Sequence, residues 1–143
     1  MLLKIKKIFP DAKLPNYAHN DDAGMDLYSN ENLEIQPQKK INVKTGIIME
    51  IPDGYAGLIW DKSGIANELI HTLAGVVDVG YRGEIIVLLI NLSNETYKIK
   101  KGQKIAQILI QKIERPEIKE ISSDNKMQNS ARGDGKFGST GMF

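Results

Sequence analysis

The chain has 143 residues, of which 41% are hydrophobic and 26% are charged, and this suits one globular domain with a moderate core. Its net charge of +1 argues against a general nucleic-acid-binding protein, which carries a strong basic excess. The absence of cysteine excludes disulfides, thiol nucleophiles and zinc–thiolate sites. The first ten residues lack the apolar run of a signal peptide or membrane span, so we expect an intracellular, cytoplasmic protein.

Short segments of alternating or apolar residues, separated by turn signals, predict a chain built almost wholly from β-strands. A short helix is predicted within 62–70, with Ser63 capping its start. Many short strands with turns between them indicate an all-β sandwich or barrel. The predicted strands cover 2–9, 23–28, 33–35, 41–51, 55–60, 85–92, 97–101 and 104–113, with a last edge at Ile118 and Ile121.

The stretch 75–84, G-V-V-D-V-G-Y-R-G-E, predicts a strand, a tight turn and a second strand. It places one acid, Asp78, among valines, where burial without a partner is costly. The carboxylate of Asp78 therefore either accepts hydrogen bonds from the amides of the turn or takes part in a reaction. The apolar run 85–92 that follows indicates a strand buried on both sides, or one buried in a subunit interface.

The end of the chain differs in composition from the rest. Residues 122–143 contain no valine, isoleucine or leucine and are rich in glycine, so we expect a single domain over 1–121 and a flexible arm over 122–143. The arm combines Arg132, Phe137, Ser139 and Thr140. A guanidinium and two hydroxyls suit phosphate, and a phenyl ring suits stacking on a base. An arm that closes on a nucleotide polyphosphate explains all four residues.

Four other patches beside strands are polar or rich in glycine, and each taken alone has a plainer interpretation. Asp26 could be a turn acid, Ser63 with Gly64 a helix cap, and Gln107 a satisfied edge residue. The patches are A-G-M-D-L at 23–27, K-S-G at 62–64, the 75–84 stretch, and G-Q-K-I-A-Q at 102–107.

These patches and the arm, in this order, resemble the five motifs of the trimeric deoxyuridine triphosphate nucleotidohydrolases, the dUTPases. The resemblance spans 23–141. It implies a jelly-roll-like, distorted β-barrel and a homotrimer with three active sites, each shared between chains. It also implies the reaction: dUTP and water give dUMP and pyrophosphate with Mg²⁺, which limits uracil incorporation into DNA and supplies dUMP for dTTP synthesis.

The resemblance also assigns roles to individual residues. Asp78 would be the general base that holds the attacking water, and Tyr81 would pack on the deoxyribose. Asp26 would touch the metal through water. Substrate binding would fall to Lys62, Ser63, Gly64 and Gln107 at the phosphates, Gly75, Val76 and Val77 at the uracil edge, Arg132, Gly138, Ser139 and Thr140 at the γ-phosphate, and Phe137 over the uracil.

The chain departs from the family pattern at four positions. The usual P-R-S-G of the second motif is D-K-S-G here, so Asp61 replaces a proline and Lys62 an arginine. Asp61 puts a negative charge beside a phosphate site, which is unfavourable unless the charge is paired. Lys136 stands where a glycine is usual, and Thr72 stands where many members carry an asparagine.

Three alternatives remain open at this point. A dCTP deaminase-like enzyme shares the fold and parts of the motifs. A dUTPase-like binding module would have lost or supplemented catalysis. A plain structural β-sandwich leaves the arm unexplained. The full set of motifs favours the dUTPase interpretation, with dUTP as the small-molecule partner and no stable nucleic-acid or membrane binding.

Overall fold

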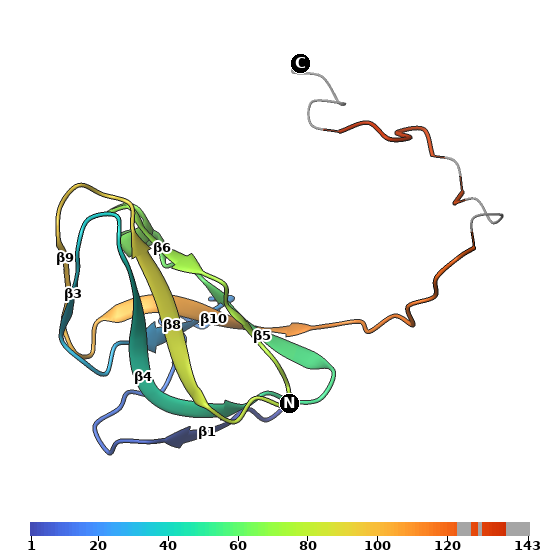
Figure 1. Cartoon of the computed structure of the whole chain (residues 1–143). Coiled ribbons are helices and arrows are strands. Elements are labelled where there is room, and N and C mark those ends of the chain that lie inside the picture. The colour runs from blue at the N-terminus through green and yellow to red at the C-terminus, as the bar shows by residue number, and fades with distance from the viewer. Residues whose placement is uncertain (123–126, 129, 137–143) are drawn as a thin grey trace.

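The computed structural model describes residues 1–122, 127–128 and 130–136 (Figure 1). Within them the chain forms ten strands and one short helix, which confirms the all-β prediction with a single helix. The elements are β1 (Lys4–Lys7), β2 (Met25–Tyr28), β3 (Leu33–Ile35), β4 (Lys40–Glu50), β5 (Tyr55–Trp60), α1 (Ser63–Ala66), β6 (Ile70–Leu73), β7 (Val76–Val77), β8 (Glu84–Asn91), β9 (Tyr97–Ile99) and β10 (Lys104–Lys112).

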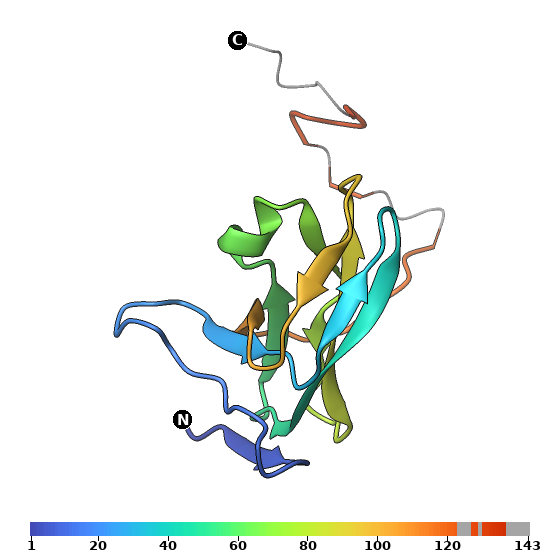
Figure 2. The same ribbon diagram turned by 90° about the vertical axis from the view of Figure 1, so that its left-hand side faces the viewer.

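The strands form two four-stranded sheets and one two-stranded ribbon, all antiparallel. The first sheet has the order β1-β4-β8-β6, and the second has the order β2-β10-β5-β7. The ribbon pairs β3 with β9 at one end of the barrel (Figures 1 and 2). The apolar residues of both sheets pack into one core, in which Met49, Leu89, Leu27 and Ile108 are fully buried.

Strand β4 pairs with two neighbours, β8 and β1, and is irregular at Gly46. Residues Lys40–Lys44 and Ile48 pair with β8, with a shift of register between Lys44 and Ile48, and residues 47–50 pair with β1 on the other edge. Gly46 has a φ of 73°, which favours glycine. A Cβ at residue 46 would lie 2.8 Å from the Cβ of Ala12, so this position also requires a residue without a side chain.

The stretch 75–84 does contain two strands around a turn, but they do not pair with each other. β7 pairs with β5 in one sheet, whereas β8 pairs with β4 and β6 in the other. The turn is closed by a hydrogen bond from the amide of Tyr81 to the carbonyl of Asp78 at 3.1 Å. Asp78 therefore lies where the chain crosses from one sheet to the other.

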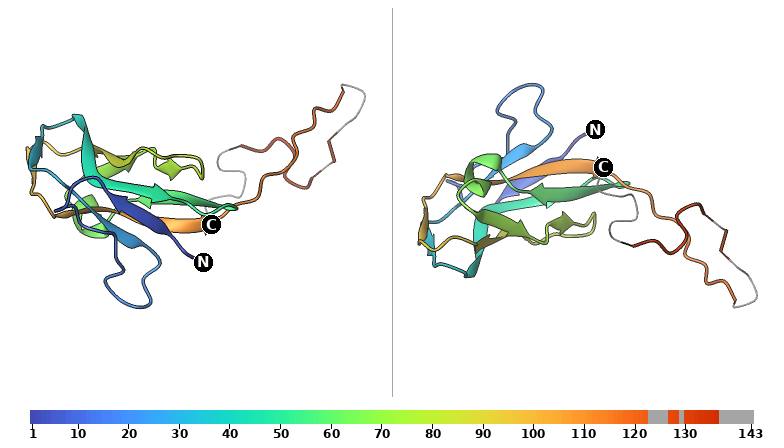
Figure 3. Two further views of the ribbon diagram at one scale, coloured as in Figure 1. Left: turned by 90° about the horizontal axis from the view of Figure 1, so that it is seen from below. Right: turned by 90° about the horizontal axis from the view of Figure 1, so that it is seen from above.

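Two local predictions were wrong. Ser63 does not cap α1, because Lys62 occupies the N-cap position and no side chain there makes a capping hydrogen bond. No strand forms at Ile118 and Ile121. Ile118 is 95% exposed, since the chain beyond Lys112 leads away from the barrel (Figure 3).

Strand β8 is buried on one face within this chain. Ile85, Val87 and Leu89 are buried in the core, whereas Ile86, Leu88 and Ile90 on the other face are partly or largely exposed. Of the two predicted arrangements, burial on both sides does not occur within one chain. Among the described residues no helix is both long and apolar enough to cross a membrane.

Candidate active site

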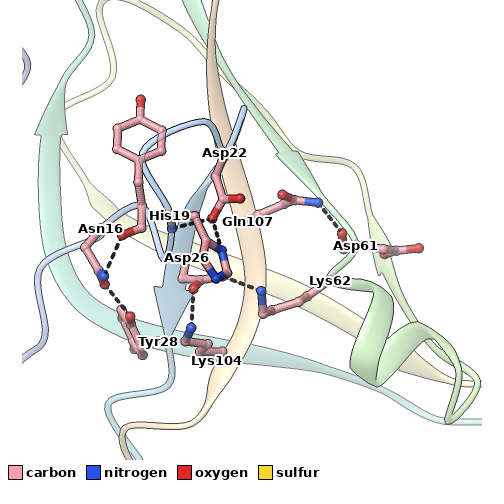
Figure 4. Close-up of polar contacts among 10 residues, drawn as sticks. Asn16, His19, Asp22, Asp26, Tyr28, Asp61, Lys62, Lys104 and Gln107 are labelled. Carbon is pink, nitrogen blue, oxygen red and sulfur yellow. Dashed lines mark hydrogen bonds and ion pairs between the residues drawn. The ribbon is translucent and has the colours of Figure 1, made fainter.

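The centre of the first group of polar residues is Asp26 on β2. Its carboxylate is 4% exposed and binds two lysines: Lys62 Nζ lies 2.7 Å from Oδ1, and Lys104 Nζ lies 2.6 Å from Oδ2 (Figure 4). Burial raises the pKa of Asp26, but hydrogen bonds from the two ammonium groups outweigh burial and hold the pKa below its ordinary 3.8. The cluster therefore carries one net positive charge.

Gln107 lies beside Asp26 because β10 and β2 are neighbours, with the two residues directly opposite each other. Its side-chain Nε2 donates to the backbone carbonyl of Asp61 at 2.9 Å (Figure 4). The glycine of the A-G-M-D-L patch has a role here. A Cβ at Gly24 would lie 2.6 Å from Oε1 of Gln107, so a larger residue would displace the amide.

Asp61 is the acid that replaces the usual proline, and its charge is paired. Oδ1 accepts hydrogen bonds from the amide of Thr72 at 2.6 Å and from its hydroxyl at 2.7 Å, and Oδ2 lies 2.5 Å from Nδ1 of His71. Burial raises the pKa of Asp61, but these partners outweigh it and hold the pKa below 3.8. The carboxylate is thus held by β6.

Ser63 and Gly64 follow Lys62 at the start of α1, and both are exposed. The space around Gly64 is open, because a Cβ there would meet no atom within 4 Å. Lys62 and Ser63 are consecutive residues between the end of β5 and the first turn of α1.

A second group surrounds a pocket of about 250 Å³ between β5, β7 and β8. Gly75, Val76, Val77, Asp78 and Tyr81 all contribute to its lining. Gly75 needs to be glycine for two reasons. Its φ is 121°, and a Cβ would lie 2.7 Å from the carbonyl oxygen of Ile59. The amide of Ile59 donates to the carbonyl of Gly75 at 2.8 Å.

Asp78 is exposed at the rim of this pocket, so the burial that the flanking valines suggested does not occur. Tyr81 is 44% exposed, and its hydroxyl donates to the carbonyl of Glu84 at 2.8 Å. Gly83 leaves room for the Tyr81 ring, because a Cβ there would lie 2.4 Å from the Tyr81 hydroxyl. Arg82 braces the turn with hydrogen bonds to the carbonyls of Val79 and Tyr81.

The two groups are connected through β5 but do not share this pocket. Gly57 of β5 lies opposite Val77, and Trp60 at its end lies opposite Gln107. The structure thus brings Asp26, Lys62 and Gln107 together, and separately Gly75 to Asp78 with Tyr81.

Arg132 lies with neither group. It is exposed, and its Nε donates to the carbonyl of Gly135 at 3.1 Å. Phe137, Gly138, Ser139 and Thr140 lie outside the described residues.

Sequence reasoning did not assign Lys104 and His71. A signal for Lys104 was present, because an acid between Met25 and Leu27 in a buried strand needs a cation, and Lys104 stands in the G-Q-K-I-A-Q patch. No local pattern pointed to His71, because its partner Asp61 is ten residues away, between β5 and α1.

A dUTPase family model matches residues 10–141 of the chain. The deoxyuridine 5'-triphosphate nucleotidohydrolase of Clostridium kluyveri is 44% identical over 148 residues, which cover the whole of both chains. The structure is similar to that of a mutant dUTPase of Staphylococcus bacteriophage 80alpha with dUpNHpp, at a TM-score of 0.90 and 29% identity over 98% of each chain. It also resembles a mutant dUTPase from phage phi11 of S. aureus, whose structure concerns the coordination of a structural Mg(II) ion, at a TM-score of 0.80 and 28% identity over 86% of this chain and 98% of that one. The chain belongs to the dUTPase family.

Proposed function

We propose that the protein hydrolyses dUTP to dUMP and pyrophosphate. Membership of the family, with relatives aligned over their full length, supports the reaction. The observation that carries the residue assignment is the position of Asp78, an exposed carboxylate at the rim of a pocket that Gly75 and Tyr81 also line. The reaction keeps dUTP low, so that uracil is not built into DNA, and it supplies dUMP for dTTP synthesis.

In this proposal Asp78 is the general base. Its carboxylate accepts a proton from a water molecule as the water oxygen bonds to the α-phosphorus. The bond from that phosphorus to the oxygen bridging the α- and β-phosphates breaks, and pyrophosphate leaves. The proton on Asp78 is then released to solvent. An exposed carboxylate suits this role, since water reaches it directly.

The uracil would bind along the backbone of Gly75, Val76 and Val77. The close approach of Gly75 to Ile59 fixes this backbone, and a fixed edge of amides and carbonyls can pair with one base and reject others. Tyr81 would place its ring against the deoxyribose, and its hydrogen bond to Glu84 holds the ring where a 2′-hydroxyl would need space.

The phosphates would bind Lys62, Ser63, Gly64 and Gln107. Lys62 can leave Asp26 for a phosphate at little cost, because Lys104 stays paired with the same carboxylate. The buried acid would then keep a partner in both the free and the bound protein. The net positive charge of the cluster favours a polyanion.

Mg²⁺ fits this site as part of the Mg–triphosphate substrate. Asp26 has an ammonium on each oxygen, and the described residues contain no cluster of three acidic or histidine side chains. A triphosphate supplies most ligands of Mg²⁺ itself and leaves several to water, so a water-mediated contact with Asp26 is enough. When bound, Mg²⁺ neutralises phosphate charge and makes pyrophosphate a better leaving group.

The active unit would be a homotrimer with shared active sites. The outer face of β8 presents Ile86, Leu88 and Ile90, and Val76 is 70% exposed, which leaves apolar surface for a neighbouring chain to cover. Because the phosphate group and the uracil pocket are separate within one chain, a neighbour could supply one half of each site.

The chain would consist of a single domain over 1–121 and an arm over 122–143. The arm would complete an active site that belongs to another subunit of the trimer. Arg132 would bind the γ-phosphate together with Gly138, Ser139 and Thr140, and Phe137 would cover the uracil. The exposure of Arg132 and the direction of the chain beyond Lys112 are consistent with a segment that reaches beyond its own barrel (Figure 1).

The test is pyrophosphate release with Mg²⁺ from dUTP, dCTP, dTTP and UTP in parallel, with ammonia measured in the same reactions. Pyrophosphate from dUTP alone supports the proposal together with its sugar and base selection. Ammonia from dCTP would identify a deaminase instead. No product from any of the four would leave a binding module as the function.

A further inference from the structure

We propose that Asp61 is a positioning residue for the phosphate-binding loop, acting through its bonds to Thr72. This inference rests on the proposed function, because it concerns how Lys62 and Gln107 are held for the triphosphate. Asp61 stands between β5 and α1, directly before Lys62. Each of its carboxylate oxygens and its carbonyl oxygen bonds to a residue of another strand.

The contacts of Asp61 join three strands at one point. Its carboxylate accepts two hydrogen bonds from Thr72 of β6, at 2.6 and 2.7 Å, and lies 2.5 Å from His71 of the same strand. Its carbonyl accepts from Gln107 of β10 at 2.9 Å. Lys62 is therefore attached to a residue whose backbone and side chain are both fixed.

The pairing also explains two departures from the family pattern at once. Where the second motif usually has proline, this chain has Asp61, and where many members have asparagine, it has Thr72. The two unusual residues bond to each other. A proline side chain accepts no hydrogen bond, so the Asp61–Thr72 contact is an alternative way to fix the loop.

The arrangement directs the Asp61 charge away from the phosphates. Thr72 is 9% exposed, and it satisfies Oδ1 with two donors from the side of β6. Hydrogen bonds to a charged acceptor are among the stronger ones in proteins. The negative charge that would repel a triphosphate is thereby used to hold the loop, and Lys62 on the next residue remains available to the anion.

Residues 73–75 continue from Thr72 into the uracil pocket, in which Thr72 itself is a lining residue. One carboxylate thus fixes the strand leading to the uracil backbone and the loop that carries the phosphate-binding lysine. A disturbance at Asp61 should weaken binding of the phosphates first, because Lys62 is its direct neighbour in the chain.

The experiment is a double-mutant cycle with Asp61→Ala, which removes the acceptor, Thr72→Val, which removes the hydroxyl donor, and the double variant. Two quantities are measured: the Kd for inorganic tripolyphosphate by calorimetry, and KM and kcat for dUTP. We expect each single variant to raise Kd and KM about tenfold, and the double variant to be little worse than Asp61→Ala, because the Thr72 hydroxyl has already lost its acceptor in that variant. Independent effects would multiply to about a hundredfold.

Two further variants separate positioning from stability. Thr72→Ser keeps the hydroxyl donor and should recover most of the loss. Thr45→Val removes another buried hydroxyl, which donates to the carbonyl of Ile85 at 2.5 Å, and should lower the melting temperature without raising KM for dUTP. A loss of folded protein lowers the apparent kcat but does not raise KM.

Multiplicative losses in the double variant, or wild-type Kd and KM in both single variants, would overturn the proposal. Absence of tripolyphosphate binding by the wild type would overturn it as well. If the wild type binds tripolyphosphate and shows the expected coupling but releases no pyrophosphate from dUTP, the proposed function fails while the positioning role of Asp61 stands.

Discussion

Lys104 and Asp26 form an ion pair of 2.6 Å whose carboxylate is 4% exposed, and Lys62 occupies the other oxygen of the same group. One buried acid thus has two cations. Only one of them is needed to keep the carboxylate paired, so the other is available to a phosphate. Several predictions of the proposed function depend on this relationship and on the geometry of the uracil pocket.

Lys104→Met should raise KM for dUTP about tenfold, which corresponds to about 1.4 kcal/mol. The reason is that Asp26 would then retain Lys62 as its single cation, and a phosphate would have to compete for it. Steady-state kinetics with dUTP measures the change. Lys98→Met is the matched control, since Lys98 pairs with Glu34 at 3.4 Å on the exposed surface and such pairs contribute little. An equal rise in KM for both variants would contradict the explanation.

Asp78→Asn should bind dUTP with nearly unchanged affinity and hydrolyse it far more slowly. Asparagine has a similar shape but cannot take the proton of the attacking water, and loss of a general base typically lowers the rate about 10²–10⁴-fold. Single-turnover kinetics with saturating enzyme isolates the chemical step. A variant with wild-type kcat would remove Asp78 from the mechanism.

Gly75→Ala should lower the stability by about 1–3 kcal/mol and weaken dUTP binding, because its backbone has a positive φ and a Cβ would contact the carbonyl of Ile59 at 2.7 Å. Gly80→Ala is the control. A Cβ at Gly80 meets nothing within 4 Å, so this variant should unfold at nearly the wild-type temperature. Thermal unfolding and dUTP titration of both variants provide the comparison.

The pH dependence of stability should contain a contribution from Asp61, whose pKa in the folded protein lies below 3.8. Because the folded pKa is the lower one, this contribution is complete above the unfolded value and is lost as the pH falls from there through the folded value. Asp61→Asn should therefore flatten the fall in melting temperature below about pH 4. Parallel curves for the wild type and the variant in acid would show that the carboxylate contributes nothing.

Deletion of residues 131–143 should leave the barrel folded and remove most dUTP turnover. None of the ten strands extends past Lys112, so the melting temperature should change little. Arg132 and the arm residues that follow it would be absent from the site. Full activity of the truncated protein would show that the arm is not needed for catalysis.

Local sequence patterns predicted much of the fold. The strand 55–60 matches β5 to the residue, because the turn at Pro52, Asp53 and Gly54 defines its start. The strand predicted at 41–51 lies one residue earlier at each end, as β4 (Lys40–Glu50), and the alternation of apolar and polar residues in 40–44 identified it. The pairing partners of β7 and β8 could not be predicted from the local sequence, since a turn between two strands does not determine whether those strands pair with each other.

The candidate site was predicted as a set of residues rather than as an arrangement. The resemblance to the family motifs named Asp26 within β2, Gln107 within β10 and Lys62 just after β5. It could not show that Lys104 completes the cluster or that Asp61 bonds to Thr72, because these contacts join residues far apart in the chain and depend on how the sheets pair. The separation of the phosphate group from the uracil pocket likewise follows from the sheet topology.

The most direct test of the proposed reaction is hydrolysis of dUTP in water enriched in ¹⁸O, with mass spectrometry of both products. Attack of water on the α-phosphorus predicts one ¹⁸O atom in dUMP and none in pyrophosphate. Label in pyrophosphate, or release of inorganic phosphate in its place, would show that water attacks another phosphorus and would contradict the position assigned to Asp78.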